Sequence, residues 1–297
     1  MTSLWIPFIL VASLLQVARN AMQRGLTAEL GTVGATLIRF LFGFPFAVLF
    51  LLIAFAATGE TMVLPSSAFW PWLLVGALTQ IAATGLMLMA MNMGSFVVAT
   101  AYIKTEPILA ALFGFAFLAD ALSAWKIVAI VLATLGVVVT AIRPGGEKAF
   151  GDLKATSVGL ASAATFAFSA VGFRGAILAV QGVSFVTVAT FTLTMGLLLQ
   201  TLVLLVYLLV FDRKTLAAIL QLWRPSMLAG LCGALSSQFL FFGFALTTVA
   251  NVRTLALIEV LYAQAVSHYT FKQKIAPREI AGVVLIVVGV GLLVAMQ

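Results

Sequence analysis

The chain has 297 residues, of which 63% are hydrophobic and only 8% are charged, and its formal net charge is +7. An ordinary soluble domain carries about 25% charged residues, so this composition excludes a soluble protein of this size and indicates an integral membrane protein. One cysteine and one histidine exclude a disulfide framework and a Cys/His metal cluster.

Apolar segments long enough to cross a bilayer follow one another along the chain. A membrane-spanning helix needs about 20 mostly apolar residues. Connections between the segments are expected to be short. The first segment has no charged residue before Arg19, so we expect it to be retained rather than cleaved as a signal peptide. Ten spans are expected, at 3–23, 31–57, 68–91, 95–118, 123–142, 156–174, 183–211, 224–248, 252–271 and 277–296.

The two halves of the chain resemble each other. Residues 125–136 align with residues 278–289 at a constant offset of 153, and the same offset places Glu106 over Glu259. The longest polar stretch lies near the midpoint, with five expected spans on each side. In addition, the tripeptide GAL recurs at positions 76 and 233.

Two halves with an odd number of spans must insert in opposite orientations, as inverted-repeat transporters do. The sequence therefore predicts an all-α membrane protein with ten transmembrane helices in two inverted five-helix repeats. The repeats are expected at residues 1–143 and 151–297.

Basic residues are concentrated on one side of this expected bundle. Ten of the 16 lysines and arginines fall in loops on one side, and two fall on the other. Because cytoplasmic loops carry the excess of lysine and arginine, the count places both termini outside the cytoplasm. The remaining four, Arg19, Arg39, Lys104 and Arg253, lie within spans or at their ends.

Lys104 and Glu106 interrupt the apolar fourth span. They are two residues apart on a helix, so they point in different directions and each needs a partner on another helix or a wet cavity. Glu106 shares a helix face with Tyr102, and Glu259 shares one with Tyr262. The functional interpretation is a polar, partly hydrated pocket at the repeat interface. The structural interpretation is a salt bridge between helices.

The first span carries a narrow polar stripe. Ser13, Gln16, Arg19, Asn20 and Gln23 recur at helical spacing and fall on one face. In a membrane this face must contact protein or water, so it either lines a cavity or forms hydrogen bonds between helices. If Arg19 faces a pocket, a bound solute with a carboxylate is favoured.

The sequence has no recognisable catalytic constellation. It contains no Walker A motif, no GxSxG after an expected strand and no Asp/His/Cys cluster. We therefore expect no enzymatic activity, no direct use of ATP, and no metal or other cofactor.

Three segments resemble the EamA-like members of the drug/metabolite transporter superfamily. Residues 37–50, LIRFLFGFPFAVLF, are similar to that family's arginine-led second helix. Residues 101–123 resemble its fourth helix, with a proline and an acidic residue in the turn, here Pro107 and Asp120. Residues 255–293 are similar to its ninth and tenth helices.

The chain departs from the family pattern at two positions. Gln273 stands where the family usually has a glutamate, and Val260 stands where it usually has a proline. The resemblance implies secondary transport, usually export, of small metabolites through a central cavity. It also implies cytoplasmic termini, which conflicts with the charge count.

The sequence and the resemblance together predict a secondary, non-ATP exporter of a small polar or amphipathic metabolite, such as an amino acid or an organic anion. It is expected to work by alternating access in a bacterial cytoplasmic (inner) membrane. The expected partners are the substrate and the lipid bilayer, with no nucleic acid and with a homodimer left open. The alternative is an integral membrane enzyme acting on a lipid or isoprenoid. The expected substrate-binding residues are Gln16, Arg19, Asn20, Tyr102, Lys104, Glu106, Glu259 and Tyr262.

Overall fold

The computed structural model describes residues 3–60, 63–93, 102–141, 153–271 and 276–295; the side chains of residues 21, 23–29, 32, 91, 92, 267, 270 and 271 are not described. Over these residues the chain is a bundle of helices without strands. The helices are α1 (Trp5–Leu41), α2 (Phe44–Thr58), α3 (Phe69–Met93), α5 (Glu106–Leu118), α6 (Ala124–Ala141), α7 (Leu153–Leu178), α8 (Phe185–Phe211), α9 (Arg213–Gln221), α10 (Trp223–Leu246), α11 (Val249–Leu255), a 3-10 turn (Ala256–Ile258), α12 (Glu259–Phe271) and α13 (Pro277–Ala295).

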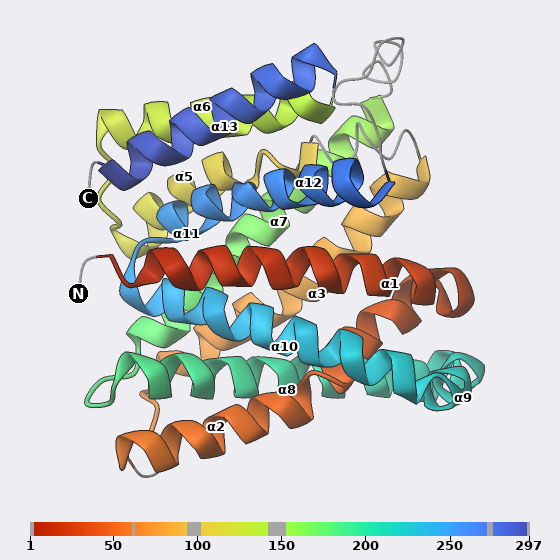
Figure 1. Ribbon diagram of the computed structural model, residues 1–297. Helices are drawn as coiled ribbons and strands as arrows, with labels where there is room; N and C mark the ends of the chain where they lie inside the picture. Colours follow the sequence, from red (N-terminus) through yellow and green to blue (C-terminus); the bar gives the residue numbers. More distant parts are fainter. Residues whose placement is uncertain (1–2, 61–62, 94–101, 142–152, 272–275, 296–297) are drawn as a thin grey trace.

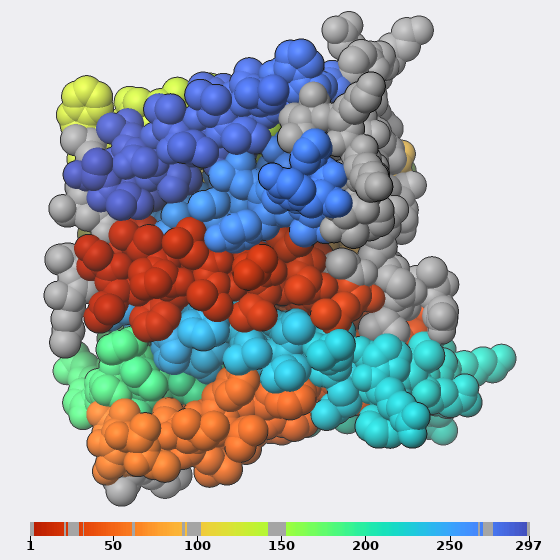
Figure 2. Space-filling model, viewed as in Figure 1, coloured from red at the N-terminus to blue at the C-terminus, as the bar shows by residue number. Residues whose placement is uncertain are grey.

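Most of the helices lie along one common direction, and both termini lie at the same end of the bundle (Figure 1). We call this the terminal end; α9 lies at the opposite end. Figure 2 shows the side chains of α1 crossing one face of the molecule between those of α10 and those of α12.

Eight of the described helical segments are long and apolar enough to cross a membrane. Two further apolar helices are shorter, at Trp5–Asn20 and Glu106–Leu118. At 1.5 Å per residue, the 13 residues of α5 reach only about 20 Å, less than the roughly 30 Å of a bilayer core. The eight spans are Val33–Thr58, Phe69–Ala90, Ala124–Ala141, Leu153–Leu178, Phe185–Phe211, Trp223–Leu246, Val249–Val266 and Pro277–Ala295.

The first two expected spans have different boundaries from those predicted. The chain stays helical from Trp5 to Leu41 but bends at Gly31, whose φ of 66° lies in the left-handed region that favours glycine. A second interruption follows at 42–43, and α2 begins at Phe44 with a proline in its first turn, where its missing N–H costs nothing. The expected span 31–57 is therefore two helical pieces, and Arg39 sits in the last turn before the joint.

One expected short connection is itself a helix. Residues 213–221 form α9, which was not predicted, between α8 and α10. Asp212 caps it by accepting from the Thr215 backbone N–H at 3.1 Å, and Ile219 is its buried side chain. Ile219, with the partly buried Leu216 and Ala218, forms its apolar contact with the core, and so short a pattern is too weak a signal to reveal this helix in the sequence.

The most extensive helix contacts are between α3 and α7, α6 and α13, and α1 and α10. Small residues let these backbones approach closely, as is common in membrane bundles. A Cβ built on Gly172 would lie 2.5 Å from the backbone nitrogen of Gly76, and one built on Gly136 would lie 2.6 Å from the carbonyl oxygen of Gly282. Side chains larger than hydrogen are therefore excluded at both contacts.

Large apolar side chains cover the outside of the bundle. On a soluble protein such a surface would aggregate, but in a bilayer it contacts lipid. Examples on different helices are Leu52, Ile53, Phe115, Val206, Val210, Val284 and Val287.

Candidate functional site

Glu106 and Glu259 occupy the same kind of position, each as the first residue of a helix that follows a break. Before Glu106 the chain makes a turn at 104–105, where the Thr105 hydroxyl donates to the Tyr102 carbonyl at 2.7 Å. Before Glu259 the chain tightens into the 3-10 turn. The two glutamates that the repeat aligns therefore stand at matching interruptions, where the backbone leaves regular α-helix in the interior of the bundle.

The two carboxylates are paired crosswise between the halves of the chain. Glu259 pairs with Lys104 and also accepts from the side-chain amide of Gln16 at 2.6 Å. Glu106 pairs with Arg253, with 2.6 Å between Nη2 and Oε1. Lys104 and Glu106 thus each have a partner on another helix, as their spacing required. Both pairs are largely shielded from solvent, so removing one partner would leave a poorly solvated charge.

Arg19 lies next to these pairs but is bonded differently. It is 6% exposed, and its Nε and Nη2 both donate to the Asn20 side-chain oxygen, at 3.3 and 2.8 Å. No carboxylate among the described residues forms an ion pair with it. Asn20 is exposed, so the Arg19–Asn20 unit connects a buried cation to the surface of the bundle.

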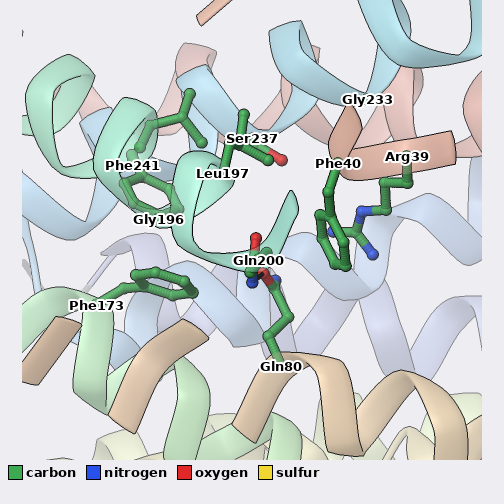
Figure 3. A pocket seen from close by; sticks show the side chains of 11 residues that line it. Arg39, Phe40, Gln80, Phe173, Gly196, Leu197, Gln200, Gly233, Ser237 and Phe241 are labelled. Carbon is green, nitrogen blue, oxygen red and sulfur yellow. Dashed lines mark hydrogen bonds between the residues drawn. The ribbon is translucent and has the colours of Figure 1, made fainter. Parts of the chain in front are cut away.

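Arg39 was counted in the sequence as a charge at a span but was not assigned to the site. Its guanidinium lies 5.4 Å from the centroid of the Phe40 ring, and it lines a cavity of about 10 Å³ (Figure 3). That volume holds about one water molecule. Polar groups of Gln80, Gln200 and Ser237 line the same cavity. The signal in the sequence was an arginine inside the apolar run LIRFLFGF.

A polar face of α8 was also missed. Gln200 donates to the Gln80 side chain at 2.6 Å, and Gln238 of α10 donates to the Thr190 hydroxyl at 2.9 Å. Threonine is compatible with apolar helices, so the stripe does not lower the hydropathy of the segment enough to stand out. The helical spacing of its polar residues was the available signal. The buried members of this face are Thr187, Thr190, Thr194, Gln200 and Thr201.

The two expected tyrosines are not members of the ion pairs themselves. The Tyr102 hydroxyl accepts from Thr156 of α7 at 3.0 Å, and a Cβ on Gly159 would lie 2.9 Å from the Tyr102 Cβ. Tyr102 therefore packs against the start of α7. Tyr262 is half-buried, and no polar contact within the described part of the chain joins it to Glu259. The contacts thus bring together Gln16, Lys104 and Glu259, but they do not include the tyrosines.

A second charged cluster lies at the terminal end of the bundle. Arg174 of α7 pairs with Asp120 at 3.1 Å and donates to the carbonyl oxygens of Phe244, at 2.6 Å, and Thr247. The other Asp120 oxygen accepts from the Val249 N–H at 3.4 Å. We call this cluster the Asp120 clasp. It ties the end of α5 to α7 and to the joint between α10 and α11.

These observations define an all-helical integral membrane protein whose interior carries paired and unpaired charges. Among the described residues, no three Asp, Glu, His or Cys side chains come together as a metal site would require.

Residues 3–142 match the family model described as the EamA-like transporter family. This match confirms the resemblance to the drug/metabolite transporter superfamily, a class of membrane transporters. A comparison with curated proteins finds no match. A solved structure described as "Crystal structure of protein" superposes with a TM-score of 0.74 at 15% identity, covering 100% of this chain and 98% of that one. At that identity the likeness concerns the fold.

Proposed function

We propose that the protein is a secondary transporter that exports a small polar or amphipathic metabolite, such as an amino acid or an organic anion, by alternating access. The observation that carries this proposal is the pair of helix interruptions at Glu106 and Glu259, joined crosswise by ion pairs in the interior. Interrupted helices and intramembrane charges in other transporters form the substrate and coupling-ion sites.

The packing supports an arrangement of ten spans in two inverted repeats. In the proposed repeat, the first span corresponds to the sixth and the third span to the eighth. A contact between the first and eighth spans should therefore have a counterpart between the sixth and third spans. α1 packs on α10, and α7 packs on α3, as this exchange requires. The contacts of α2 with α8 and of α6 with α13 join expected mates. Rocking of one repeat against the other would then expose the interior to each side in turn.

Within this proposal, Arg19 binds the negative charge of the substrate, and Gln16 and Asn20 shape the site beside it. Lys104, Glu106 and Glu259 are charge partners whose rearrangement accompanies transport, and either glutamate could carry a coupling proton. The contacts support this for Gln16, which bonds Glu259, and for Asn20, which bonds Arg19. Tyr102, which precedes the turn at 104–105 and so does not share a helix with Glu106, and Tyr262, which follows Glu259 in α12, remain proposed pocket residues.

We place the transporter in a bacterial cytoplasmic membrane, as the family resemblance implies. No observation favours the alternative of an enzyme acting on a lipid or isoprenoid. Such an enzyme would need clustered carboxylates or histidines near one interface, and the two described interior glutamates are instead each occupied by a cation.

The test is flux of labelled amino acids and organic acids in proteoliposomes of the full chain. Arg19→Ala and Glu106→Gln are compared with wild type, with unfolding temperature measured for each. The double variant Glu106→Gln/Arg253→Gln, which leaves no unpaired charge at that site, controls for folding. Flux that falls in Arg19→Ala and in the double variant, with both folded, supports the proposal. Absence of flux for every solute, or full activity in both, contradicts it.

A further inference from the structure

The interior contains more positive than negative side chains. Apart from Arg174 and Asp120, which pair with each other, the described cations there are Arg19, Arg39, Lys104 and Arg253, and the described carboxylates are Glu106 and Glu259. Each carboxylate is taken by a different cation: one by the lysine and the other by Arg253. Arg19 and Arg39 form no ion pair with any described carboxylate. Within the described part of the chain, two guanidinium groups, which remain charged at any physiological pH, are therefore left over.

These two arginines share one contact surface on α10. A Cβ built on Gly233 would lie 3.2 Å from Cδ of Arg19 and 3.9 Å from Cγ of Arg39. The two side chains therefore flank the same glycine, although Arg19 lies before the bend at Gly31 and Arg39 lies after it. A charge in a membrane interior costs several kcal/mol unless a partner of opposite charge offsets it.

The equivalent interface in the other half is built differently. Gly76 aligns with Gly233 through the repeated GAL tripeptide. A Cβ built on Gly172 of α7 would lie 2.5 Å from the backbone nitrogen of Gly76, so the backbones of α7 and α3 are in contact there. The interface between α3 and α7 is formed by two glycines in contact, whereas the corresponding interface between α1 and α10 contains arginine side chains. Close packing of such an interface does not require arginine.

Side chains with hydrogen-bond donors line the small cavity beside Arg39. Gln80, Gln200 and Ser237 line the small cavity with it, and Figure 3 shows the Gln80 and Gln200 side chains extending from neighbouring helices toward one another. Gln200 donates to the Gln80 oxygen, which leaves the Gln80 amide N–H groups to donate elsewhere. A region with guanidinium, amide and hydroxyl donors suits an anion.

We propose that Arg19 and Arg39 together bind a solute with two negative charges, either a dicarboxylate or a phosphate monoester. A dianion neutralises the charge left by the two interior ion pairs, whereas a monoanion or a zwitterion leaves one or both arginines uncompensated. The cavity beside Arg39 holds about one water molecule in this state, so α8 or α10 must shift relative to α1 when the solute enters. This inference rests on the proposed transport function and narrows its substrate class.

The test is equilibrium binding by calorimetry to the full chain in lipid nanodiscs. The probes are succinate, its monomethyl ester as a monoanion of similar size, and glycerol 3-phosphate. The variants are Arg39→Gln, Arg39→Lys and, as a matched control at an exposed arginine, Arg213→Gln. An unfolding temperature for each variant separates loss of binding from loss of fold.

We expect at least one dianion to bind about tenfold or more tightly than the monoester, because a charged hydrogen-bond partner is gained. Arg39→Gln should abolish that preference, while Arg39→Lys and Arg213→Gln should largely keep it. Binding of succinate but not glycerol 3-phosphate would identify the solute as a dicarboxylate, and the reverse result would identify it as a phosphate monoester. Equal binding of dianion and monoanion, no binding of either dianion, or an unchanged preference in folded Arg39→Gln overturns the inference.

The outcomes also separate this inference from the transport function. Flux of an amino acid or monoanion without dianion binding would leave transport standing and reject the dianion site. Dianion binding that depends on Arg39, without flux of any solute, would support the site and reject transport.

Discussion

Replacing Glu106 with glutamine should destabilise the protein by an amount that depends on Arg253. The two side chains are 16% and 14% exposed, and 2.6 Å separates Oε1 from Nη2. With an effective dielectric constant of 20, two unit charges at that distance attract by about 6 kcal/mol before desolvation is subtracted. Removing one partner of a buried pair typically costs about 3–5 kcal/mol, since the other charge is left buried.

The double variant Glu106→Gln/Arg253→Gln should be much closer to wild type. Both charges are then gone, and replacing a whole buried pair by neutral groups is often nearly neutral. The single Arg253→Gln variant should be less damaging than Glu106→Gln, because a carboxyl group can take up a proton whereas a guanidinium stays charged.

The measurement is a double-mutant cycle on the free energy of unfolding in mixed detergent micelles. We expect a coupling energy of about 2–4 kcal/mol between the two positions. An additive cycle, in which the double variant loses the sum of the two single losses, would refute the view that this pair neutralises interior charge. The exposed Arg213→Gln, combined with Glu106→Gln, is the additive control.

Three further outcomes follow from contacts elsewhere in the bundle. Gly172→Ala should destabilise the fold by about 1–3 kcal/mol in detergent unfolding, because its Cβ would press on the Gly76 backbone and separate α7 from α3. Arg174→Gln should weaken the contacts of the Asp120 clasp. In a chain whose single native cysteine is replaced by alanine, cysteines introduced in the segments that the clasp joins should then be labelled faster. The Thr215 hydroxyl and backbone N–H both donate to Asp212 and hold the pKa of its carboxyl group below the ordinary value of 3.8. The cap of α9 is therefore complete at neutral pH and is lost as the pH falls below that value. Hydrogen exchange of the α9 amides should then accelerate, and Asp212→Asn should remove this pH dependence.

Composition and hydropathy were sufficient to predict a helical membrane protein, because nothing else explains so few charges in so long a chain. The spacing of Lys104 and Glu106 correctly required partners on other helices, since residues two apart cannot face each other. Because charges inside spans are few, the candidate partners were Arg19, Glu259 and Arg253. Glu259 and Arg253 are the partners observed, whereas Arg19 forms no ion pair with a described carboxylate.

Other features left weaker traces in the sequence. The bend at Gly31 depends on one backbone angle, which a glycine permits but does not dictate. Arg39 was counted inside the expected span 31–57, and the joint at 42–43 that ends α1 just after it was not predicted. The Thr/Gln face of α8 was hidden because threonine is nearly neutral in hydropathy.

The crosswise ion pairs have a consequence for how the chain is made. Lys104 and Glu106 are synthesised and inserted with the first half, but the groups that neutralise them, Glu259 and Arg253, come from helices that enter the membrane last. Until those helices are inserted, Lys104 and Glu106 are without the partners that neutralise them. Each half therefore completes the other electrostatically, so neither should persist as a stable unit alone, and two fragments divided near residue 147 should accumulate only when they are produced together.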